Sequence, residues 1–311
     1  MFIMQSMINL KHRANRVQTK TCFQYAEVPP MFIMQSMINL KPQPQYYMFG
    51  AIVGDIIGSR FEFSSAPQKG FELFTDECNF TDDTICTIAV ADALIHKKDF
   101  KWTLHEWCRR YPHPMGEYGN RFYNWVRSDD PQPTGSYGNG AAMRVSSVGW
   151  LIDDYNEVLD VARQTAIVSH DHPEGIKGAQ CVAALIYWLR TCRIDKFEVE
   201  RSVKRGFGYV IPSLADVYKI GSEGHFDGTC QETVPMAIRC FLDAHSFEET
   251  IRLSVMAGGD TDTKTAIAGS IAEAYYDVPD WMIERANAYL PHEMSVVIED
   301  FYNYMADKWR E

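Results

Sequence analysis

This chain of 311 residues lacks several features that would place it in a well-known class of proteins. Its eight cysteines include no C-x-x-C pair, and several lie in apolar helical patterns, so we expect reduced, buried thiols. No apolar run reaches the roughly 18 residues that a membrane span needs, which predicts a soluble, cytoplasmic protein. Positive charge is also scarce, because the formal net charge is −11. This balance argues against a nucleic-acid-binding surface, which needs a basic stripe.

The chain is rich in hydrophobic sequence with helical spacing. Hydrophobic residues make up 46% of it and aromatic residues 13%, which is ample for a large buried core. Apolar residues recur every three or four positions in five segments, whereas the alternation typical of strands is nearly absent. The five segments are residues 84–96, 174–190, 231–242, 247–257 and 264–276. The pattern predicts an all-α fold built as a single compact multi-helix domain.

The N-terminal part of the chain differs from the rest. The segment MFIMQSMINLK at residues 1–11 recurs identically at residues 31–41, and one repeat is too few for a solenoid. This part is Met-rich, basic and punctuated by prolines. We therefore predict that residues 1–47 form a leader outside the fold and that residues 48–311 form the domain. A basic targeting presequence remains an alternative.

Two short acidic clusters are the most informative feature of the domain, because each directly precedes an apolar helical stretch and they lie about 180 residues apart. An acid before a helix is often only an N-cap, and this interpretation stays open. One capping oxygen would suffice, however, and like charges this close are unfavourable unless a cation bridges them. Carboxylates and hydroxyls without His or Cys favour hard ions such as Mg²⁺ or Mn²⁺. The clusters, which we interpret as two halves of one metal site, contain Thr81, Asp82, Asp83, Asp260, Asp262 and Thr263.

Other segments carry further candidate residues. The motif GDIIGSRFE has glycines that allow close helix packing, and it holds Asp55, which could be a buried acid hydrogen-bonded to a helix end. It ends at Glu62, which could be a base, a metal ligand or a plain exposed acid. The glycine-rich GSYGNG, which starts at Gly135, can bind phosphate through its amides, and Tyr137 offers a face for a base. Such loops are common, and a single histidine such as His170 is more often structural.

Six motifs in this order resemble the ADP-ribosylglycohydrolase family, which includes the dinitrogenase-reductase-activating glycohydrolases and the ADP-ribosyl-acceptor hydrolases. The motifs are GDIIGSRFE, FTDDT, GSYGNGAAMR, the SH pair at 169–170, ETVPMAI and AGGDTDTKTAIAGSIAEAYY. The resemblance covers about residues 48–290. It implies an all-α domain whose cleft holds two divalent cations, Mg²⁺ or Mn²⁺. It also implies hydrolytic removal of ADP-ribose from a modified protein or small conjugate, by cleavage at C1 of the ribose.

The resemblance further implies a role for individual residues. By motif position, the metal ligands are Thr81, Asp82, Asp83, Asp260, Asp262 and Thr263. The catalytic residues are Asp83, Asp262 and Glu62, the last of which matches a mobile glutamate that closes over the metals. The substrate-binding residues are Gly116, Gly135, Ser136, Tyr137, Gly138, Asn139 and His170. The loop 221–229 has no clear counterpart in the family, which leaves the acceptor open.

Two other functions stay open at this point. A non-catalytic ADP-ribose-binding or nucleotide-binding module of the same fold would be expected to lose its acidic ligands, and all six are present here. A metal phosphohydrolase acting on another ester would be expected to carry a Lys or Arg clamp beside the acids, and the motifs lack one. The sequence therefore favours the ADP-ribosyl hydrolase, with its acceptor, metal and oligomeric state unspecified.

Overall fold

The computed structural model describes residues 47–223 and 225–308, and regular structure within these ranges is helical. No β-strand occurs in this part of the chain, although isolated bridges pair Thr81 with Met115 and Gly138 with Thr229. A short π-helix, η2 (Trp188–Cys192), continues the end of α9. The α-helices are α2 (Phe49–Ser59), α3 (Asp82–Ile95), α4 (Phe100–Arg110), α5 (Asn120–Arg127), α6 (Gly140–Met143), α7 (Ser146–Leu151), α8 (Tyr155–Ile167), α9 (Pro173–Tyr187), α10 (Lys196–Phe207), α11 (Leu214–Ser222), α12 (Cys230–Asp243), α13 (Phe247–Met256), α14 (Thr261–Glu273), α15 (Asp280–Asn287) and α16 (His292–Lys308).

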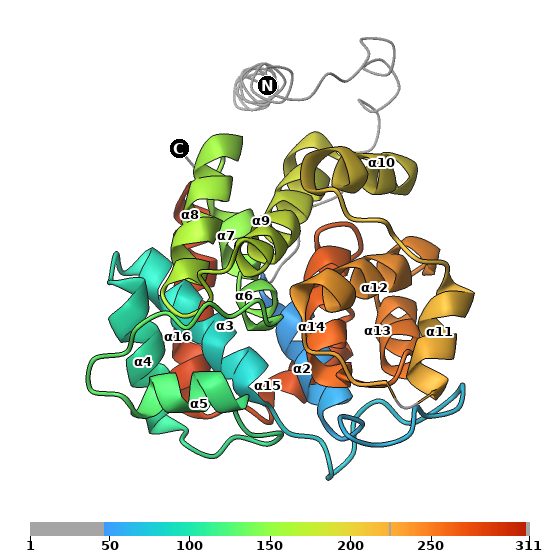
Figure 1. Ribbon diagram of the computed structural model, residues 1–311, viewed down its shortest axis with the longest axis horizontal. Coiled ribbons are helices and arrows are strands. Elements are labelled where there is room, and N and C mark those ends of the chain that lie inside the picture. Colours follow the sequence, from blue (N-terminus) through green and yellow to red (C-terminus); the bar gives the residue numbers. More distant parts are fainter. Residues whose placement is uncertain (1–46, 224, 309–311) are drawn as a thin grey trace, which may run out of the picture.

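Helices α2 and α14 pack side by side at the centre of the molecule, although they come from opposite ends of the domain (Figure 1). Three glycines four residues apart, Gly50, Gly54 and Gly58, allow this close approach. A Cβ at Gly58 would come within 2.6 Å of the Asp262 Cα, and one at Gly54 would overlap the Thr265 carbonyl. Residues four apart share one face of a helix, so the glycines form a strip that the backbone of α14 fills. This contact sets the start of α14 against the end of α2.

Asp55, also on α2, fixes the start of α3. Its fully buried carboxylate accepts hydrogen bonds from the backbone N–H and the hydroxyl of both Thr81 and Thr84. The two bonds from Thr81 measure 2.9 Å from N and 2.7 Å from Oγ1. Burial raises the pKa of Asp55 to about 6, and the bonds from the two threonines act in the opposite direction. The expectation that Asp55 is a buried acid at a helix end is confirmed, and α2 therefore positions the starts of both α3 and α14.

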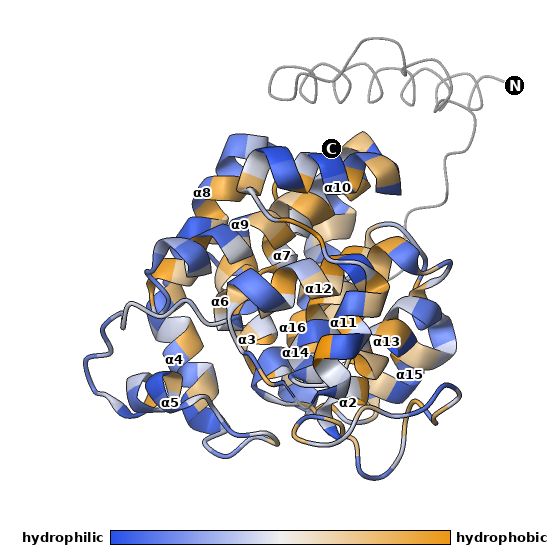
Figure 2. Ribbon diagram, turned by 45° about the vertical axis from the view of Figure 1, so that its right-hand side comes forward, coloured by the Kyte–Doolittle hydropathy of each residue, from blue (hydrophilic) through white to orange (hydrophobic). Residues whose placement is uncertain are grey.

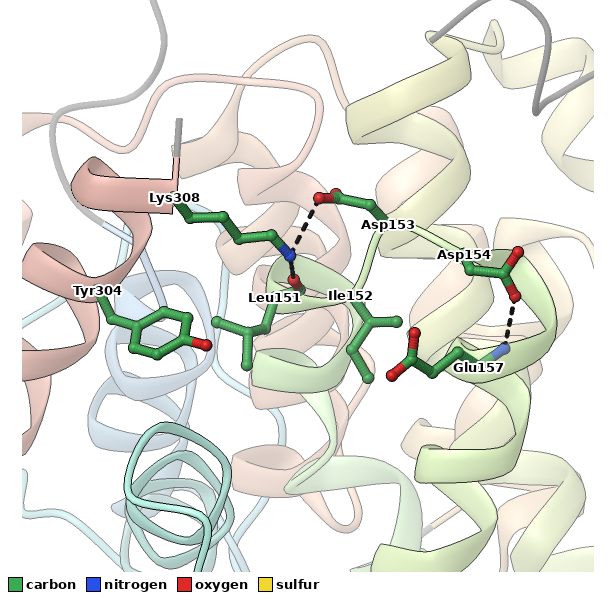
Figure 3. Close-up of a pocket in the computed structure, with 7 residues that line it drawn as sticks. All are labelled: Leu151, Ile152, Asp153, Asp154, Glu157, Tyr304 and Lys308. Carbon is green, nitrogen blue, oxygen red and sulfur yellow. Dashed lines mark hydrogen bonds and ion pairs between the residues drawn. The ribbon is translucent and has the colours of Figure 1, made fainter. Parts of the chain in front are cut away.

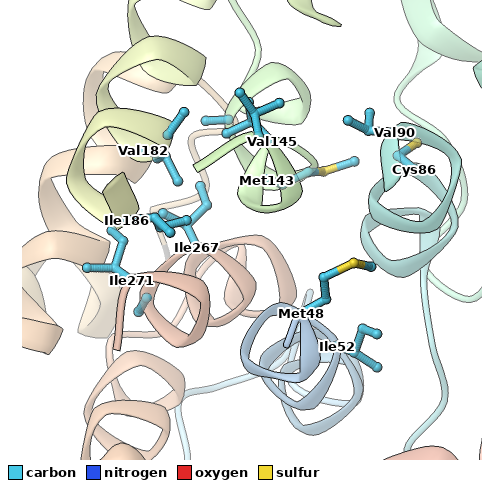
Figure 4. Packing of buried hydrophobic residues seen from close by; sticks show 14 of the residues in the cluster. Met48, Ile52, Cys86, Val90, Met143, Val145, Val182, Ile186, Ile267 and Ile271 are labelled. Carbon is cyan, nitrogen blue, oxygen red and sulfur yellow. The ribbon is translucent and has the colours of Figure 1, made fainter. Parts of the chain in front are cut away.

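The remaining helices enclose a hydrophobic core around this centre. Figure 4 shows side chains from α2, α3, α6, α9 and α14 meeting there, among them Ile52, Val90, Met143, Ile186 and Ile267. Outer helices such as α8 and α10 carry both hydrophilic and hydrophobic residues, as expected when only one face packs inward (Figure 2). The acidic clusters therefore lie at the starts of α3 and α14, and the rest of each helix packs in the core.

The five segments with apolar helical spacing are all helices, with ends within about three residues of those expected. The prediction of an all-α, single compact domain is confirmed. Reduced, buried thiols are confirmed for six cysteines, and Cys192 is not among them. The six are Cys78, Cys86, Cys108, Cys181, Cys230 and Cys240.

The predicted leader, residues 1–47, lies outside the described residues except for Tyr47, so it stays a prediction. Tyr47 is buried, with 4% of its surface exposed. Within the described ranges, no helix combines the length and the apolar character required to cross a membrane.

The glycine strip of α2 can be tested by adding one methyl group. Gly54→Ala should lower the free energy of unfolding by about 2 kcal/mol or more, because the new Cβ overlaps the backbone of α14. Gly206→Ala is the matched control, because Gly206 lies inside α10 with its nearest neighbour, a Trp188 side-chain atom, 3.8 Å from such a Cβ. That control should be neutral or slightly stabilising. Chemical denaturation measures both, and equal stability of the two variants would contradict the packing.

Candidate metal centre

The two acidic clusters meet in space at the starts of α3 and α14. Thr263 donates a hydrogen bond from Oγ1 to Asp83 Oδ2 at 3.1 Å, across 180 residues of sequence. Thr81 caps α3, because its hydroxyl accepts the Asp83 N–H at 3.1 Å, whereas Asp260 makes no side-chain cap bond to α14. Asp83, Asp260 and Asp262 are all buried. Since a threonine does the capping in α3, ordinary capping does not explain why these aspartates are buried together.

Glu62 joins the cluster from the turn that follows α2. Carboxylate oxygens of Glu62, Asp260 and Asp262 lie within 4.8 Å of one another. The backbone of Gly116 lies directly against Glu62, because a Cβ there would overlap Glu62 Oε2, and Gly116 has a φ of +81°. The sequence suggested a substrate loop at Gly116, and the structure places this glycine where it supports the Glu62 side chain.

Among the described residues, no N–H or hydroxyl group donates a hydrogen bond to three buried carboxylate oxygens of this cluster, namely Glu62 Oε2, Asp83 Oδ1 and Asp262 Oδ1. Each unpaired buried acceptor costs about 1–3 kcal/mol, and more when it is charged. Oxygens of Glu62, Asp260 and Asp262 lie within 4.8 Å of one another, and Asp83 is joined to this group through its hydrogen bond with Thr263. Buried carboxylates gathered from two helix starts and a turn indicate a site for a positively charged ligand. An all-oxygen donor set suits a hard divalent cation better than Zn²⁺. The residues therefore fit the kind of ion that the sequence predicts.

In the absence of a cation, four carboxyl groups of this centre hold their protons more tightly than ordinary acids do, namely Glu62, Asp82, Asp83 and Asp262. Burial raises the pKa of Glu62 to about 9 and that of Asp82 to about 8, and neighbouring carboxylates add to both shifts. Burial also raises the pKa of Asp83 and of Asp262 well above the ordinary range, and repulsion from nearby acids acts in the same direction. A bound cation would replace these protons, because it lowers the energy of the charged form.

A buried lysine lies close to the acids. Lys264 is 5% exposed, and its Nζ donates to the carbonyl of Gly258, in the turn that precedes Asp260. Burial lowers the pKa of Lys264, and the charge of Asp260 acts to raise it. Lys264 was not predicted from the sequence, and the expectation that no Lys or Arg lies beside the acids is wrong, because Lys264 interacts with both Asp260 and Asp262. A single lysine within the apolar stretch of α14 was the signal that could have identified it.

Asn139, expected among the substrate-binding residues, contacts the acidic cluster. Its Nδ2 donates to Asp260 Oδ2 at 2.7 Å and to Thr233 Oγ1 at 3.0 Å, and its side chain is buried. Its backbone N–H donates to the Gly228 carbonyl at 2.8 Å. Asn139 therefore ties the glycine-rich loop to Asp260, and both of its side-chain hydrogens are used in doing so.

The rest of the glycine-rich loop folds on itself and leaves an aromatic ring exposed. Gly135 has a φ of +65°, a conformation that favours glycine. Ser136 Oγ accepts the Gly138 N–H at 3.2 Å. The Tyr137 ring is 40% exposed and packs edge-on against His172, with ring centroids 5.1 Å apart. An exposed ring held by a second ring is well suited to stack against a planar base.

His170 is buried behind this loop and contacts Ser169, which in turn contacts Arg144. Arg144 donates from Nη2 to Ser169 Oγ at 2.9 Å, so the Ser169 hydroxyl proton is free to point at His170 Nδ1, 2.8 Å away. Burial, and then the charge of Arg144, lower the pKa of His170 well below its ordinary value, which keeps the ring neutral. The Nε2 atom faces the loop at Gly140, and it carries the ring proton when Ser169 donates to Nδ1. His170 can thus donate a hydrogen bond towards the loop.

Residues 225–229 were not recognised from the sequence as part of the site. Gly228 accepts the Asn139 N–H, and the His225 carbonyl lies against Gly259, where a Cβ would come within 2.7 Å of it. The segment therefore lies between the glycine-rich loop and the turn that precedes Asp260. The Asp-Gly pair before the apolar residues of α12 was the available sequence signal.

Two other features lie outside the acidic cluster. His225, Asp227 and Glu232 form a second group of possible ligand atoms within 4.8 Å of one another, but His225 is exposed and the two acids are only half-buried. A pocket between the end of α7, the start of α8 and the end of α16 contains none of the residues expected from the sequence (Figure 3). Its lining residues are Leu151, Ile152, Asp153, Asp154, Glu157, Tyr304 and Lys308.

Comparisons with known proteins place the chain in a family and show its fold. The sequence model of the ADP-ribosylglycohydrolase family matches residues 46–310. ADP-ribosylhydrolase ARH3 of Mus musculus is 26% identical over 302 residues, covering 73% of this chain and 82% of that protein. ADP-ribosyl-[dinitrogen reductase] glycohydrolase of Rhodospirillum rubrum is 26% identical over 262 residues, covering 74% and 84%. A solved ADP-ribosylglycohydrolase-related protein complex has a TM-score of 0.62 at 23% identity, covering 84% of this chain and 97% of that one, and shows the shared fold.

The raised pKa values of Glu62 and Asp82 allow a prediction of how the stability of the metal-free protein depends on pH. Folding raises the pKa of Glu62 to about 9 and that of Asp82 to about 8, from ordinary values near 4. Their stabilising contribution is therefore fully present at low pH and is lost as the pH rises through the folded-state values. Metal-free protein should become less stable between about pH 6 and pH 9, and Mn²⁺ should reverse most of the loss. Thermal unfolding with EDTA or with Mn²⁺ measures this.

A buried acid at the other end of α14 supplies the control. Burial raises the pKa of Glu273 to about 8. Its ionisation therefore also lowers the stability of the folded protein as the pH rises. Glu273→Gln should reduce the pH dependence without changing the effect of Mn²⁺, whereas Asp262→Asn should abolish the effect of Mn²⁺. Metal-free stability that stays level or rises over this pH range would contradict the account.

Proposed function

The chain belongs to the ADP-ribosylglycohydrolase family, a family of hydrolases, as its motifs indicated, and we propose that it removes ADP-ribose from a modified acceptor in a metal-dependent reaction. The acceptor is a side chain of an ADP-ribosylated protein or a related small conjugate, and the bond that breaks is at C1 of the ribose. The observation that carries this proposal is the gathering of buried carboxylates, with oxygens of Glu62, Asp260 and Asp262 within 4.8 Å of one another and Asp83 joined to them through Thr263.

We assign two divalent cations, Mg²⁺ or Mn²⁺, to this centre. The ligands are Thr81, Asp82, Asp83, Asp260, Asp262 and Thr263. When bound, such ions supply Lewis-acid stabilisation and orient sugar hydroxyls and water. The Thr81 hydroxyl already donates to Asp55 and accepts the Asp83 N–H, so it can add at most one lone pair. The aspartates therefore provide most of the negative charge.

The glycine-rich loop binds the ADP part of the substrate in this proposal. The exposed Tyr137 ring, with His172 beside it, stacks against the adenine. The Nε2 atom of His170 faces this loop, and in the tautomer that carries a proton there it donates to a diphosphate oxygen. Asn139 holds Asp260 in place, so the loop couples the position of the diphosphate to the acidic cluster.

In this proposal, the carboxylates of the centre assist cleavage of the bond at C1 of the ribose. Glycoside cleavage passes through a ribose with positive charge at C1, and the buried charges of Asp83 and Asp262 stabilise it. Glu62 accepts a proton from the water that attacks C1, because its unpaired Oε2 lies in the same cluster. Burial of these groups strengthens each electrostatic contribution, since few water molecules screen it.

We further propose that residues 48–311 form the catalytic domain and that the protein is cytoplasmic. The match to the family model begins at residue 46, which supports the domain boundary. The free thiols of six buried cysteines support a reducing compartment.

Substitution of the central aspartates tests the proposed reaction. Asp83→Asn and Asp262→Asn should lower the rate of ADP-ribose release by about a hundredfold or more while the fold stays intact, because each removes charge from the centre. Peptides carrying ADP-ribosyl-arginine or ADP-ribosyl-serine are incubated with and without Mg²⁺ or Mn²⁺, and released ADP-ribose is quantified. Asp160→Asn, at an exposed position on α8, is the control and should leave the rate unchanged.

The same assay separates the alternatives. Full activity of either variant in the presence of metal would refute the assignment of the centre. Binding of ADP-ribose by the wild-type protein without release from any peptide would instead support a binding module. Phosphate release from simple esters would support a phosphohydrolase.

A further inference from the structure

Two exposed phenylalanines stack against each other beside the acidic cluster. Phe63 is 71% exposed and Phe226 is 46% exposed, and their rings are 5.3 Å apart with only 20° between their planes. Neither ring belongs to the hydrophobic core of the described chain. Large apolar rings at such exposure contribute little to burial, so this contact calls for an explanation other than core packing.

The backbone at Phe63 is held in a conformation that side chains disfavour. Its φ is +59°, in the left-handed region that β-carbons destabilise. Such conformations persist only where neighbouring contacts hold them, and they concentrate at functional sites. In this turn, the ring contact with Phe226 is the interaction that holds the Phe63 side chain.

Glu62 lies between two aromatic anchors of different strength. On one side, Phe61 is 8% exposed and packs edge-on against Phe71 at 5.2 Å within the core. On the other side, the Phe63 ring stacks on the exposed ring of Phe226, and the Ser64 N–H and hydroxyl donate to the Phe61 carbonyl across the turn. The contact between Phe61 and Phe71 is part of the core, whereas the exposed contact between Phe63 and Phe226 buries little surface and can open more easily. The Gly116 backbone lies against the end of the Glu62 side chain, and the exposed stack is the contact that joins the Glu62 turn to the segment of Phe226.

The partner ring belongs to the segment that supports Asp260. Phe226 follows His225, whose carbonyl lies against Gly259, and precedes Gly228, which accepts the Asn139 N–H. The stack thus joins the turn that carries Glu62 to the segment that lies beside the turn before Asp260. The two sides of the candidate metal centre are linked at this point by one pair of rings.

We propose that Phe63 and Phe226 are positioning residues, whose stacking holds Glu62 towards Asp260 and Asp262. This inference rests on the proposed function, in which Glu62 accepts a proton at the reacting ribose. When the rings separate, Phe63 relaxes to an ordinary backbone conformation and Glu62 turns away from the cluster. A stacked aromatic pair contributes about as much free energy as a left-handed residue costs, so loss of one ring shifts the balance to the released state.

Hydrogen exchange measured by mass spectrometry tests the stack without any substrate. In Phe226→Ala, amides of residues 60–66 should exchange about two- to tenfold faster than in the wild-type protein, as expected for the loss of one aromatic pair. Phe226→Tyr keeps a ring and should restore wild-type exchange. Phe197→Ala removes another exposed ring, 72% exposed on α10, and should leave these amides unchanged. Unchanged exchange in Phe226→Ala would overturn the proposal.

Kinetics test whether the rings act through Glu62. Phe226→Ala should lower kcat a few-fold with little change in KM, and Phe226→Tyr should restore it. In a Glu62→Gln background, Phe226→Ala should cause no further loss, because both changes remove the same group from the site. A further loss in that background would overturn the positioning role. If the wild-type protein released no ADP-ribose, the proposed function would fail, and the exchange experiment would still decide whether the stack holds the turn.

Discussion

The burial of several carboxylates in one small space is the constraint on which this structure depends. Asp83 and Asp262 come from different helices, both are shielded from water, and each keeps one oxygen without a partner. Like charges in such an environment repel strongly, and a polypeptide tolerates them only as protonated acids or around a cation. Ionised carboxylates in this centre therefore lower the stability of the fold, and a bound divalent ion would offset their repulsion.

Helix α2 is the part of the scaffold that makes this arrangement possible. Its glycine strip admits α14 at a separation that no side chain would allow, and Asp55 on the same helix holds the start of α3 through four hydrogen bonds. The two acidic clusters are therefore held together by one rigid element. Precise positioning of this kind favours catalysis, because charges that need not reorganise stabilise a transition state most effectively.

Patterns local to the sequence were enough to predict the helices, the two acidic clusters and the role of Asp55, since each depends on spacing or on residue type within a few positions. Contacts between distant segments could not be read in this way. Asn139 reaches Asp260 across 121 residues, and nothing near Asn139 distinguishes it from a substrate ligand. The environment of His170 depends on Arg144, and the position of Phe226 depends on how its segment folds against Gly259. These features arise from tertiary packing, which no local pattern specifies.

Diffraction from crystals soaked with Mn²⁺ tests the central claim most directly, because anomalous scattering locates the metal without reference to activity. The account predicts manganese at the paired helix starts, about 2.1 Å from carboxylate oxygens of Asp83 and Asp262. Crystals in which these oxygens bind no metal, or in which manganese appears only at the exposed group of His225, Asp227 and Glu232, would contradict it.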